Sequence, residues 1–180
     1  MTELTLGPVY YLWDGPKWRD FYLRIADEAP VDRVILGETV CSKRQHFIEP
    51  YLADVVERLE RAGKSVAFSS LALVTLEREG RIVKDLIETS DHPIEVNDLS
   101  AIGLIKGRQH LVGPLVNVYN GPTARLLAQR GAVEAQGVEL LAQGAGPAGE
   151  GSGFGHGDWR LRSTGWRVGL ASCASAWYRM

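Results

Sequence analysis

The sequence has few of the residues that mark several common classes of protein. Its 180 residues include two cysteines, Cys41 and Cys173, too few for a disulfide scaffold or a four-cysteine zinc site. The longest apolar runs, such as residues 71–74, are far shorter than a membrane-spanning helix, and the N-terminus lacks the basic and apolar regions of a signal peptide. A net charge of −2 gives no basic surface for nucleic acid or an anionic membrane. We therefore expect a cytoplasmic, soluble protein.

Common catalytic and nucleotide-binding motifs are missing as well. Neither a Gly-x-Gly-x-x-Gly turn nor a Gly-x-x-x-x-Gly-Lys-Ser/Thr loop occurs, so the usual modes of nucleotide binding have no support. The histidines lack the His-Glu-x-x-His spacing of a zinc hydrolase, and no Ser–His–Asp arrangement can be argued. We expect surface or packing roles for all four, which are His46, His92, His110 and His156.

The amino-acid composition of the chain changes abruptly near residue 141. The segment 142–180 holds 9 of the 20 glycines, 3 of the 5 tryptophans and four arginines, and it shows no helical or strand period. We predict a domain over residues 1–141 and an irregular, exposed tail over residues 142–180. Two explanations of the tail stay open. One is a glycine-rich linker. The other is a reading-frame error, because GC-rich DNA read out of frame typically yields Gly, Ala, Arg and Trp.

Residues 1–141 alternate short apolar runs with stretches of helical period. This alternation predicts repeated βα units, and hence parallel strands joined by right-handed crossovers. An open doubly wound sheet and a βα barrel are both compatible with the pattern. The expected strands are 4–13, 31–36, 65–69, 94–96, one within 110–118, and one starting at 138–140; the expected helices are 17–29, 47–62, 71–89 with a break near Gly80, 98–106 and 122–130.

Polar residues follow four of these expected strands. Since the carboxyl ends of parallel strands meet at one edge, such residues are expected to line a common pocket. Asp98 and Asn120 have an alternative role, because each is placed to cap the helix that follows. The polar strand ends are Glu38 and Thr39, Ser69 and Ser70, Glu95, Asn97 and Asp98, and Asn117, Tyr119 and Asn120. Among them we name as substrate-binding candidates Glu38, Asn97, Asp98, Asn117, Tyr119 and Asn120.

Cys41 follows the second expected strand, beside Lys43 and Arg44. Nearby positive charge favours the thiolate, which is the form that binds metal, whereas a lone cysteine is otherwise a small buried apolar residue. We predict that Cys41 lies at the carboxyl end of that strand, on the same face as Asn97 and Asn117.

Five stretches occur in an informative order: LGPVYY at 6–11, LGETVCSKR at 36–44, SSLALV at 69–74, EVNDLS at 95–100 and NVYN at 117–120. This set resembles the UbiV-like family of oxygen-independent ubiquinone biosynthesis, within the collagenase-like peptidase superfamily. The resemblance runs from about residue 4 to about residue 140, and LGETVCSKR is its most specific element.

The resemblance implies a βα-barrel-like fold and a [4Fe–4S] cluster held by four cysteines, the first of which falls on Cys41. It also implies a heterodimer with a UbiU-like protein, acting with other ubiquinone-biosynthesis proteins as a subunit of an anaerobic, oxygen-independent hydroxylase complex. The other three ligands have no match here, because Cys173 lies in a different setting. We therefore expect this chain, as written, not to hold a stable cluster alone.

The chain is also shorter than a complete barrel, which takes about 250 residues. We expect a partial barrel that is truncated or frame-shifted after about residue 140. Two alternatives to the ubiquinone role stay open: a member of the peptidase superfamily without peptidase activity, and an inactive fragment that keeps only a partner surface.

Overall fold

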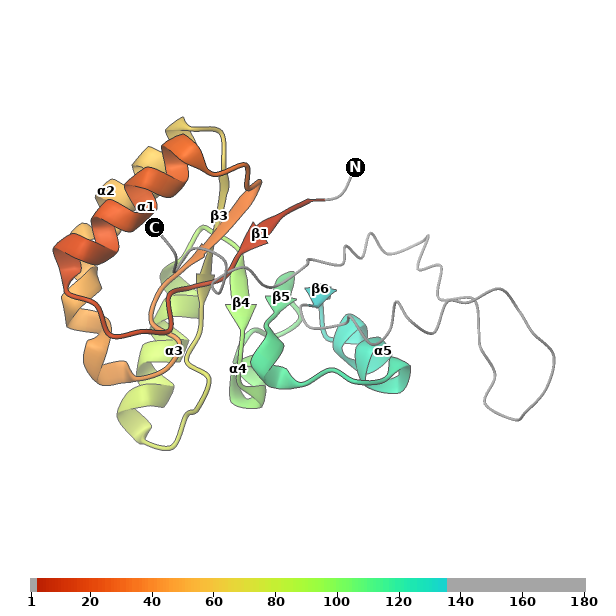
Figure 1. Ribbon diagram of the computed structural model, residues 1–180. Coiled ribbons are helices and arrows are strands. Elements are labelled where there is room, and N and C mark those ends of the chain that lie inside the picture. The colour runs from red at the N-terminus through yellow and green to blue at the C-terminus, as the bar shows by residue number, and fades with distance from the viewer. Residues whose placement is uncertain (1–2, 136–180) are drawn as a thin grey trace.

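The computed structural model describes residues 3–135, which form a curled sheet of six parallel strands with helices between them (Figure 1). Each strand pairs with the next one along the chain, from β1 to β6 in order. The sheet is thus half of a barrel, which confirms the expected α/β fold of repeated βα units. The strands are β1 (Thr5–Leu6), β2 (Arg33–Leu36), β3 (Ser65–Ser69), β4 (Ile94–Val96), β5 (His110–Val112) and β6 (Ala132–Ala135). The helices are α1 (Gly15–Glu28), α2 (Gln45–Arg61), α3 (Glu77–Thr89), α4 (Leu99–Leu104) and α5 (Gly121–Gln129), with short 3-10 helices at Ser42–Arg44 and Pro114–Val116.

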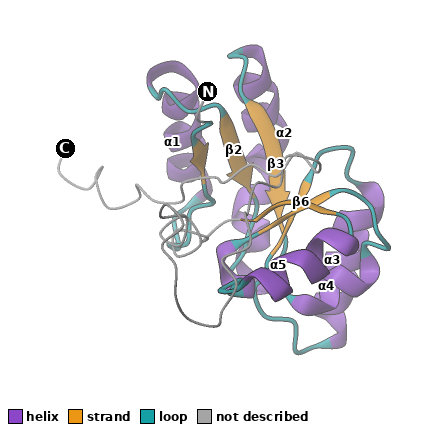
Figure 2. Cartoon of the chain, turned by 90° about the vertical axis from the view of Figure 1, so that its right-hand side faces the viewer, coloured by secondary structure: helices purple, strands orange, loops and turns teal. Residues whose placement is uncertain are grey.

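The convex face of the sheet carries all five α-helices in two groups. Alternate residues of β2 and β3, including Val34, Leu36 and Val66, pack against α1 and α2. The outward residues of β4, β5 and β6 pack against α3, α4 and α5 in a second apolar cluster. Figure 2 shows α1 and α2 as one pair and the other three helices gathered beyond them. The two clusters leave the concave face to the remaining strand residues.

The concave face holds a thin apolar layer above an ionic one. Ile35, Ala67 and Leu111 lie buried there, with Val133 packed against them. Nearer the amino ends of the strands, Arg33 binds Glu134 at 2.6 Å and Glu3 at 3.1 Å. Because Arg33 lies on β2 and Glu134 on β6, this ion pair joins strands that are not neighbours in the sheet. The curl of the sheet therefore brings distant strands into contact across its hollow.

Two sequence predictions are corrected by the structure. Residues 71–76 are not helical: α3 begins only at Glu77, because the Glu79 carboxylate accepts hydrogen bonds from the backbone N–H groups of Thr75 and Leu76 and fixes the helix start there. Gly80 lies inside α3 and does not break it. The first strand is shorter than predicted, since pairing stops at Leu6 and Pro8 has no N–H to donate.

The other element boundaries agree closely with the sequence pattern. β3 and β4 have the predicted bounds, and the predicted fifth strand and the predicted helix at 122–130 are present with small shifts. A sixth strand occurs at Ala132–Ala135, whereas 138–140 and the tail at 142–180 lie outside the described residues. Within residues 3–135, no helix has the length and apolar character needed to cross a bilayer.

Candidate functional site

A hydrogen-bonded cluster of buried polar side chains lies at the carboxyl ends of β3 and β4. The Asn97 amide nitrogen donates to Ser69 Oγ and to Glu95 Oε2, both at 2.9 Å. Ser69 Oγ is also 2.7 Å from Thr39 Oγ1, and Ser70 Oγ accepts from the Asn97 backbone at 2.9 Å. All five side chains are at most 3% exposed. We call this group, Thr39, Ser69, Ser70, Glu95 and Asn97, the polar cluster.

Strand alternation explains why these residues meet. Ile94 and Val96 face the helices, so Glu95 between them faces the concave side, as does Asn97 two residues later. Ser69 is the register partner of Glu95 on the neighbouring strand. Gly113, after β5, leaves room for the amide, because a Cβ at that position would lie 2.0 Å from Asn97 Oδ1. The cluster thus follows from strand register and one glycine.

Two acceptor atoms of the polar cluster are left without partners. Glu95 Oε1 and Asn97 Oδ1 are buried and make no hydrogen bond within the described structure. A buried polar atom without a partner costs roughly 1–3 kcal/mol, so such atoms call for a specific explanation. The two side chains are hydrogen-bonded to each other through their other polar atoms. The two atoms without partners therefore lie in one small region.

Glu95 has no cation beside it among its hydrogen-bond partners. Burial raises the pKa of its carboxyl group above the usual value, and the charge of Glu134 adds to the rise, while hydrogen bonds from Asn97 and Ser69 oppose it. Burial also raises the pKa of the Tyr10 phenol, with a further contribution from the charge of Glu95. The Tyr10 side chain is 40% exposed, and its backbone carbonyl accepts a hydrogen bond from Arg44.

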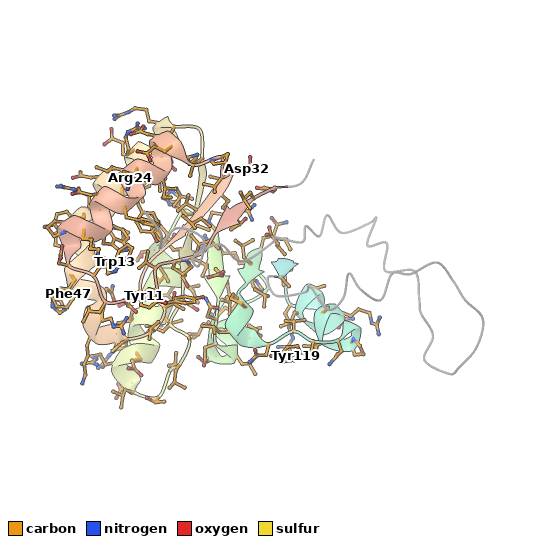
Figure 3. All side chains as sticks on the ribbon, in the orientation of Figure 1. Tyr11, Trp13, Arg24, Asp32, Phe47 and Tyr119 are labelled. Carbon is orange, nitrogen blue, oxygen red and sulfur yellow. The ribbon has the colours of Figure 1, made fainter. Side chains whose placement is uncertain are left out.

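Exposed apolar side chains are concentrated at the carboxyl edge of the sheet, the edge at which the polar cluster also lies. All the large apolar residues that are exposed in residues 3–135, except Leu4 and Leu126, lie in a loop or first helical turn that follows a strand. Figure 3 shows Tyr11, Phe47 and Tyr119 on the side where the strands end, and Asp32 at the opposite end. The most exposed of them define what we call the apolar rim: Tyr11, Leu12, Leu73, Leu76, Leu99 and Tyr119.

The structure distributes the six predicted substrate-binding residues unevenly. Asn97 lies in the polar cluster, whereas Asp98 and Asn120 cap α4 and α5 by accepting from the backbone N–H of Ser100 and Thr123. Both residues therefore cap helices, which is the other role that their positions predict. The other three lie in loops at the same edge: Glu38 accepts from the Val40 and Cys41 backbones, and Asn117 Oδ1 accepts from the exposed Tyr119 hydroxyl.

Cys41 lies in the loop between β2 and α2, after the carboxyl end of β2, as predicted. Its backbone N–H donates to Glu38 Oε1 at 2.9 Å, and its neighbour Ser42 bonds to Glu79 of α3. Asn97 and Asn117 follow β4 and β5 at the same edge, although no hydrogen bond joins either to Cys41. The loop is thus fixed on both sides of the thiol.

The described residues do not by themselves provide the donor set of a [4Fe–4S] cluster. Such a cluster is held by four thiolates, and Cys41 is the one cysteine within residues 3–135. The same part of the chain has no group of three or more His, Cys, Asp or Glu side chains able to hold a metal ion. Cys173 and His156 lie outside the described residues.

Thr39, Ser69 and Glu95 are polar strand ends in the sequence, but they are not among the six predicted substrate-binding residues. The available signal was a charged residue between Ile94 and Val96 in a short buried strand, because strand alternation turns it to the opposite face from its neighbours. Its partner Asn97 follows the same strand, whereas Ser69 lies on the neighbouring strand and could be placed beside Glu95 only from the register between the two strands.

Among known proteins, no protein-family model matches this chain, and no solved structure matches it. The chemistry of the site is therefore read from its own groups. A carboxyl group whose pKa is raised by burial, an amide and three hydroxyls lie in one hydrogen-bonded network at the edge that also carries the apolar rim. This arrangement can bind a polar group, orient it and hold a proton beside it.

Proposed function

We propose that this chain is an accessory protein of oxygen-independent hydroxylation in ubiquinone biosynthesis and acts together with a UbiU-like partner. One observation carries the proposal: three of the stretches that resemble the UbiV-like family converge on the polar cluster. LGETVCSKR contributes Thr39, SSLALV contributes Ser69 and Ser70, and EVNDLS contributes Glu95 and Asn97. Stretches that are far apart in sequence and meet in one network are typical of a functional site.

In this proposal the polar cluster binds and orients a polar group, and Glu95 holds a proton near it. An iron–sulfur cluster remains part of the expectation for the complex, with Cys41 as one ligand. Because Cys41 and Cys173 are the two cysteines of the sequence, a cage of four thiolates would need ligands from the partner. The proposed role of the polar cluster does not depend on that assembly.

The proposal is tested by the ubiquinone content of bacteria that lack their own UbiV-like protein and grow without oxygen. The wild-type chain, produced with a UbiU-like partner, is expected to restore ubiquinone. Thr39→Val should restore it poorly, because the substitution keeps the shape and removes the hydroxyl that contacts Ser69. Thr123→Val, on α5 and outside the cluster, should behave as wild type.

Failure of the wild-type chain to restore ubiquinone, with both proteins present in the cell, would contradict the proposal. Equal activity of the two threonine variants would leave the polar cluster without the role assigned to it. Anaerobic purification of the complex and iron counting then show, as a separate readout, whether a cluster is bound.

A further inference from the structure

A shallow groove lies on the convex face of the sheet, where the two helix groups separate (Figure 2). α2 packs chiefly on α1, and α3 packs on α4, so the groove opens along the other side of α2. Its volume is about 460 Å³, which is within the range of protein binding sites. We call it the seam groove and define it by Leu52, Val56 and Phe68 with Glu49, Glu57 and Glu60.

Phe68 forms the floor of the seam groove, and its exposure follows from its place on β3. Its register partners, Leu36 on β2 and Ile94 on β4, are fully buried, whereas Phe68 is only partly buried and packs against both convex-face clusters. Leu52 and Val56 of α2 are also partly buried and line the same groove. The described helices therefore leave an apolar strip uncovered between the two parts of the core.

Carboxylates give the seam groove a negative edge. Glu49, Glu57 and Glu60 are exposed, and the described residues that line the groove include no Lys or Arg. Glu57 pairs with Arg61, and Glu60 contacts His92, but such pairs at the surface are weak. An occupant that suits this groove combines apolar side chains with positively charged ones.

The sequence itself contains a segment with this complementary chemistry. Residues 159–167, WRLRSTGWR, include three arginines, two tryptophans and one leucine, and no acidic residue. Tryptophan and arginine are the residue types most enriched among the anchors of protein interfaces. The segment follows residues 144–157, which include seven glycines, a composition typical of a flexible linker.

The length of chain between β6 and this segment is enough to reach the seam groove. β6 ends at Ala135, and the Glu49 end of the groove lies at the same edge of the sheet, because α2 begins there. Residues 136–158 span up to about 80 Å when extended, whereas half the perimeter of a domain of this size is roughly 60 Å. A tether of this kind keeps the segment at roughly millimolar local concentration, so even a weak contact would be populated.

We propose that residues 159–167 bind in the seam groove of the same chain. The tryptophans lie against Leu52, Val56 and Phe68, the arginines lie beside the three glutamates, and the glycine-rich residues act as the tether. The proposal does not rest on the proposed function, and it favours the linker explanation of the tail over a reading-frame error. A second copy of the chain and a basic helix of another protein are the competing occupants.

The proposal is tested by disulfide trapping in the full-length chain, after Cys41→Ser and Cys173→Ser have removed the native thiols. Thr164→Cys places one thiol in the segment, and Ala53→Cys places the other at an exposed position that lines the groove. In the control pair, Leu126→Cys on α5 replaces Ala53→Cys; it is exposed and closer to the segment along the chain, so random encounters favour it. Oxidised glutathione drives the reaction, and mass spectrometry of tryptic peptides identifies the linked pair. We expect the groove pair to link about tenfold faster than the control pair.

Charge variants test the contribution of the glutamates. Glu49→Lys/Glu57→Lys should slow linking of the groove pair about tenfold, because it reverses the charge beside the arginines. Glu28→Lys/Glu88→Lys changes the net charge equally at exposed positions of α1 and α3, so it should leave the rate unchanged. Trypsin should also cleave the segment faster in Glu49→Lys/Glu57→Lys than in wild type, which gives a readout without engineered cysteines.

Tryptophan variants test the apolar contact. Trp166→Ser should slow linking of the groove pair about tenfold, whereas Trp177→Ser, which lies outside the segment, should not. Equal rates for the groove pair and the control pair would overturn the proposal, as would an unchanged rate in either Glu49→Lys/Glu57→Lys or Trp166→Ser. Disulfides that form only between chains would also overturn it and would identify a second copy as the occupant.

Discussion

At the scale of single residues, the concave face contains two buried glutamates in opposite circumstances. Glu134 has a guanidinium partner, because Arg33 contacts it at 2.6 Å. Among residues 3–135, Glu95 has an amide and a hydroxyl as partners and no cation, and burial raises the pKa of its carboxyl group. Glu134 thus has a countercharge beside it, whereas burial works against the ionisation of Glu95. This difference makes Glu95 the residue whose substitution is most informative.

Glu95 should make the protein less stable as the pH rises above the acidic range. The folded state keeps the Glu95 proton to higher pH than the unfolded chain, whose glutamate pKa is about 4.3. Above that value the folded state binds more protons, so this residue lowers the free energy of unfolding as pH increases. Glu95→Gln should therefore be more stable than wild type at pH 7 and similar to it at about pH 4.

Urea unfolding followed by circular dichroism at several pH values measures this difference. The control is Glu77→Gln, an exposed glutamate of α3, which should show little change with pH. A Glu95→Gln protein that is less stable than wild type at pH 7 would show that Glu95 carries a charge in the folded state.

At the scale of elements, polar side chains determine where several helices begin. Asp14, Asp98 and Asn120 each accept a hydrogen bond from a backbone N–H in the first turn of the helix that follows. Pro16 and Pro122 occupy first-turn positions of α1 and α5, where a missing N–H costs nothing. The helices at the carboxyl edge are thus fixed by residues that would otherwise pass for ligand-binding groups.

Asn120→Ala is expected to destabilise the protein by about 1 kcal/mol, because it removes the cap of α5. Asn120→Asp keeps an acceptor at the same place and should retain most of the stability. Thermal unfolding of the two variants beside wild type measures the difference. A stable Asn120→Asp protein that fails to restore ubiquinone would contradict the purely structural role of Asn120.

Most of the helices and strands could be predicted from the sequence, because their signals are local. The apolar run of β3 and the Trp18, Tyr22 and Ile25 spacing of α1 are local signals, and both elements lie close to where they were expected. The irregular conformation of residues 71–76 could not be predicted, because their apolar residues are spaced as in a helix. The true start of α3 depends on hydrogen bonds to the Glu79 side chain. For the candidate site, the local pattern predicts which strand ends are polar. That Glu95 belongs to the polar cluster while Asp98 caps a helix depends on the register between strands.

At the scale of the whole molecule, the curled sheet has no hydrogen-bonded closure between β1 and β6 among the described residues. Side chains join the two sides instead. Arg33 on β2 reaches Glu134 on β6 and also Glu3 before β1, and the apolar layer of Ile35, Leu111 and Val133 lies beside these contacts. Arg33 and this apolar layer are thus the contacts that join the two sides of the half-barrel among residues 3–135.

Arg33→Met should destabilise the protein by about 3 kcal/mol, because it leaves Glu134 buried without a countercharge. The double variant Arg33→Met/Glu134→Met should recover most of this loss, since two apolar side chains of suitable size can replace a buried ion pair. Urea unfolding of the wild type, both single variants and the double variant completes the thermodynamic cycle. Additive losses in the double variant would mean that the pair does not couple β2 to β6.

The two partners of Arg33 also differ in when they become available during synthesis. Glu3 precedes Arg33 by 30 residues, whereas Glu134 follows it by 101. At ribosomal speeds of about 5–20 residues per second, β6 is completed roughly 5 to 20 s after β2. Closing the longer loop costs about 1 kcal/mol more in chain entropy. Glu3 is thus the first countercharge that the nascent chain offers Arg33, and the final contact across the hollow forms only after all six strands have been made.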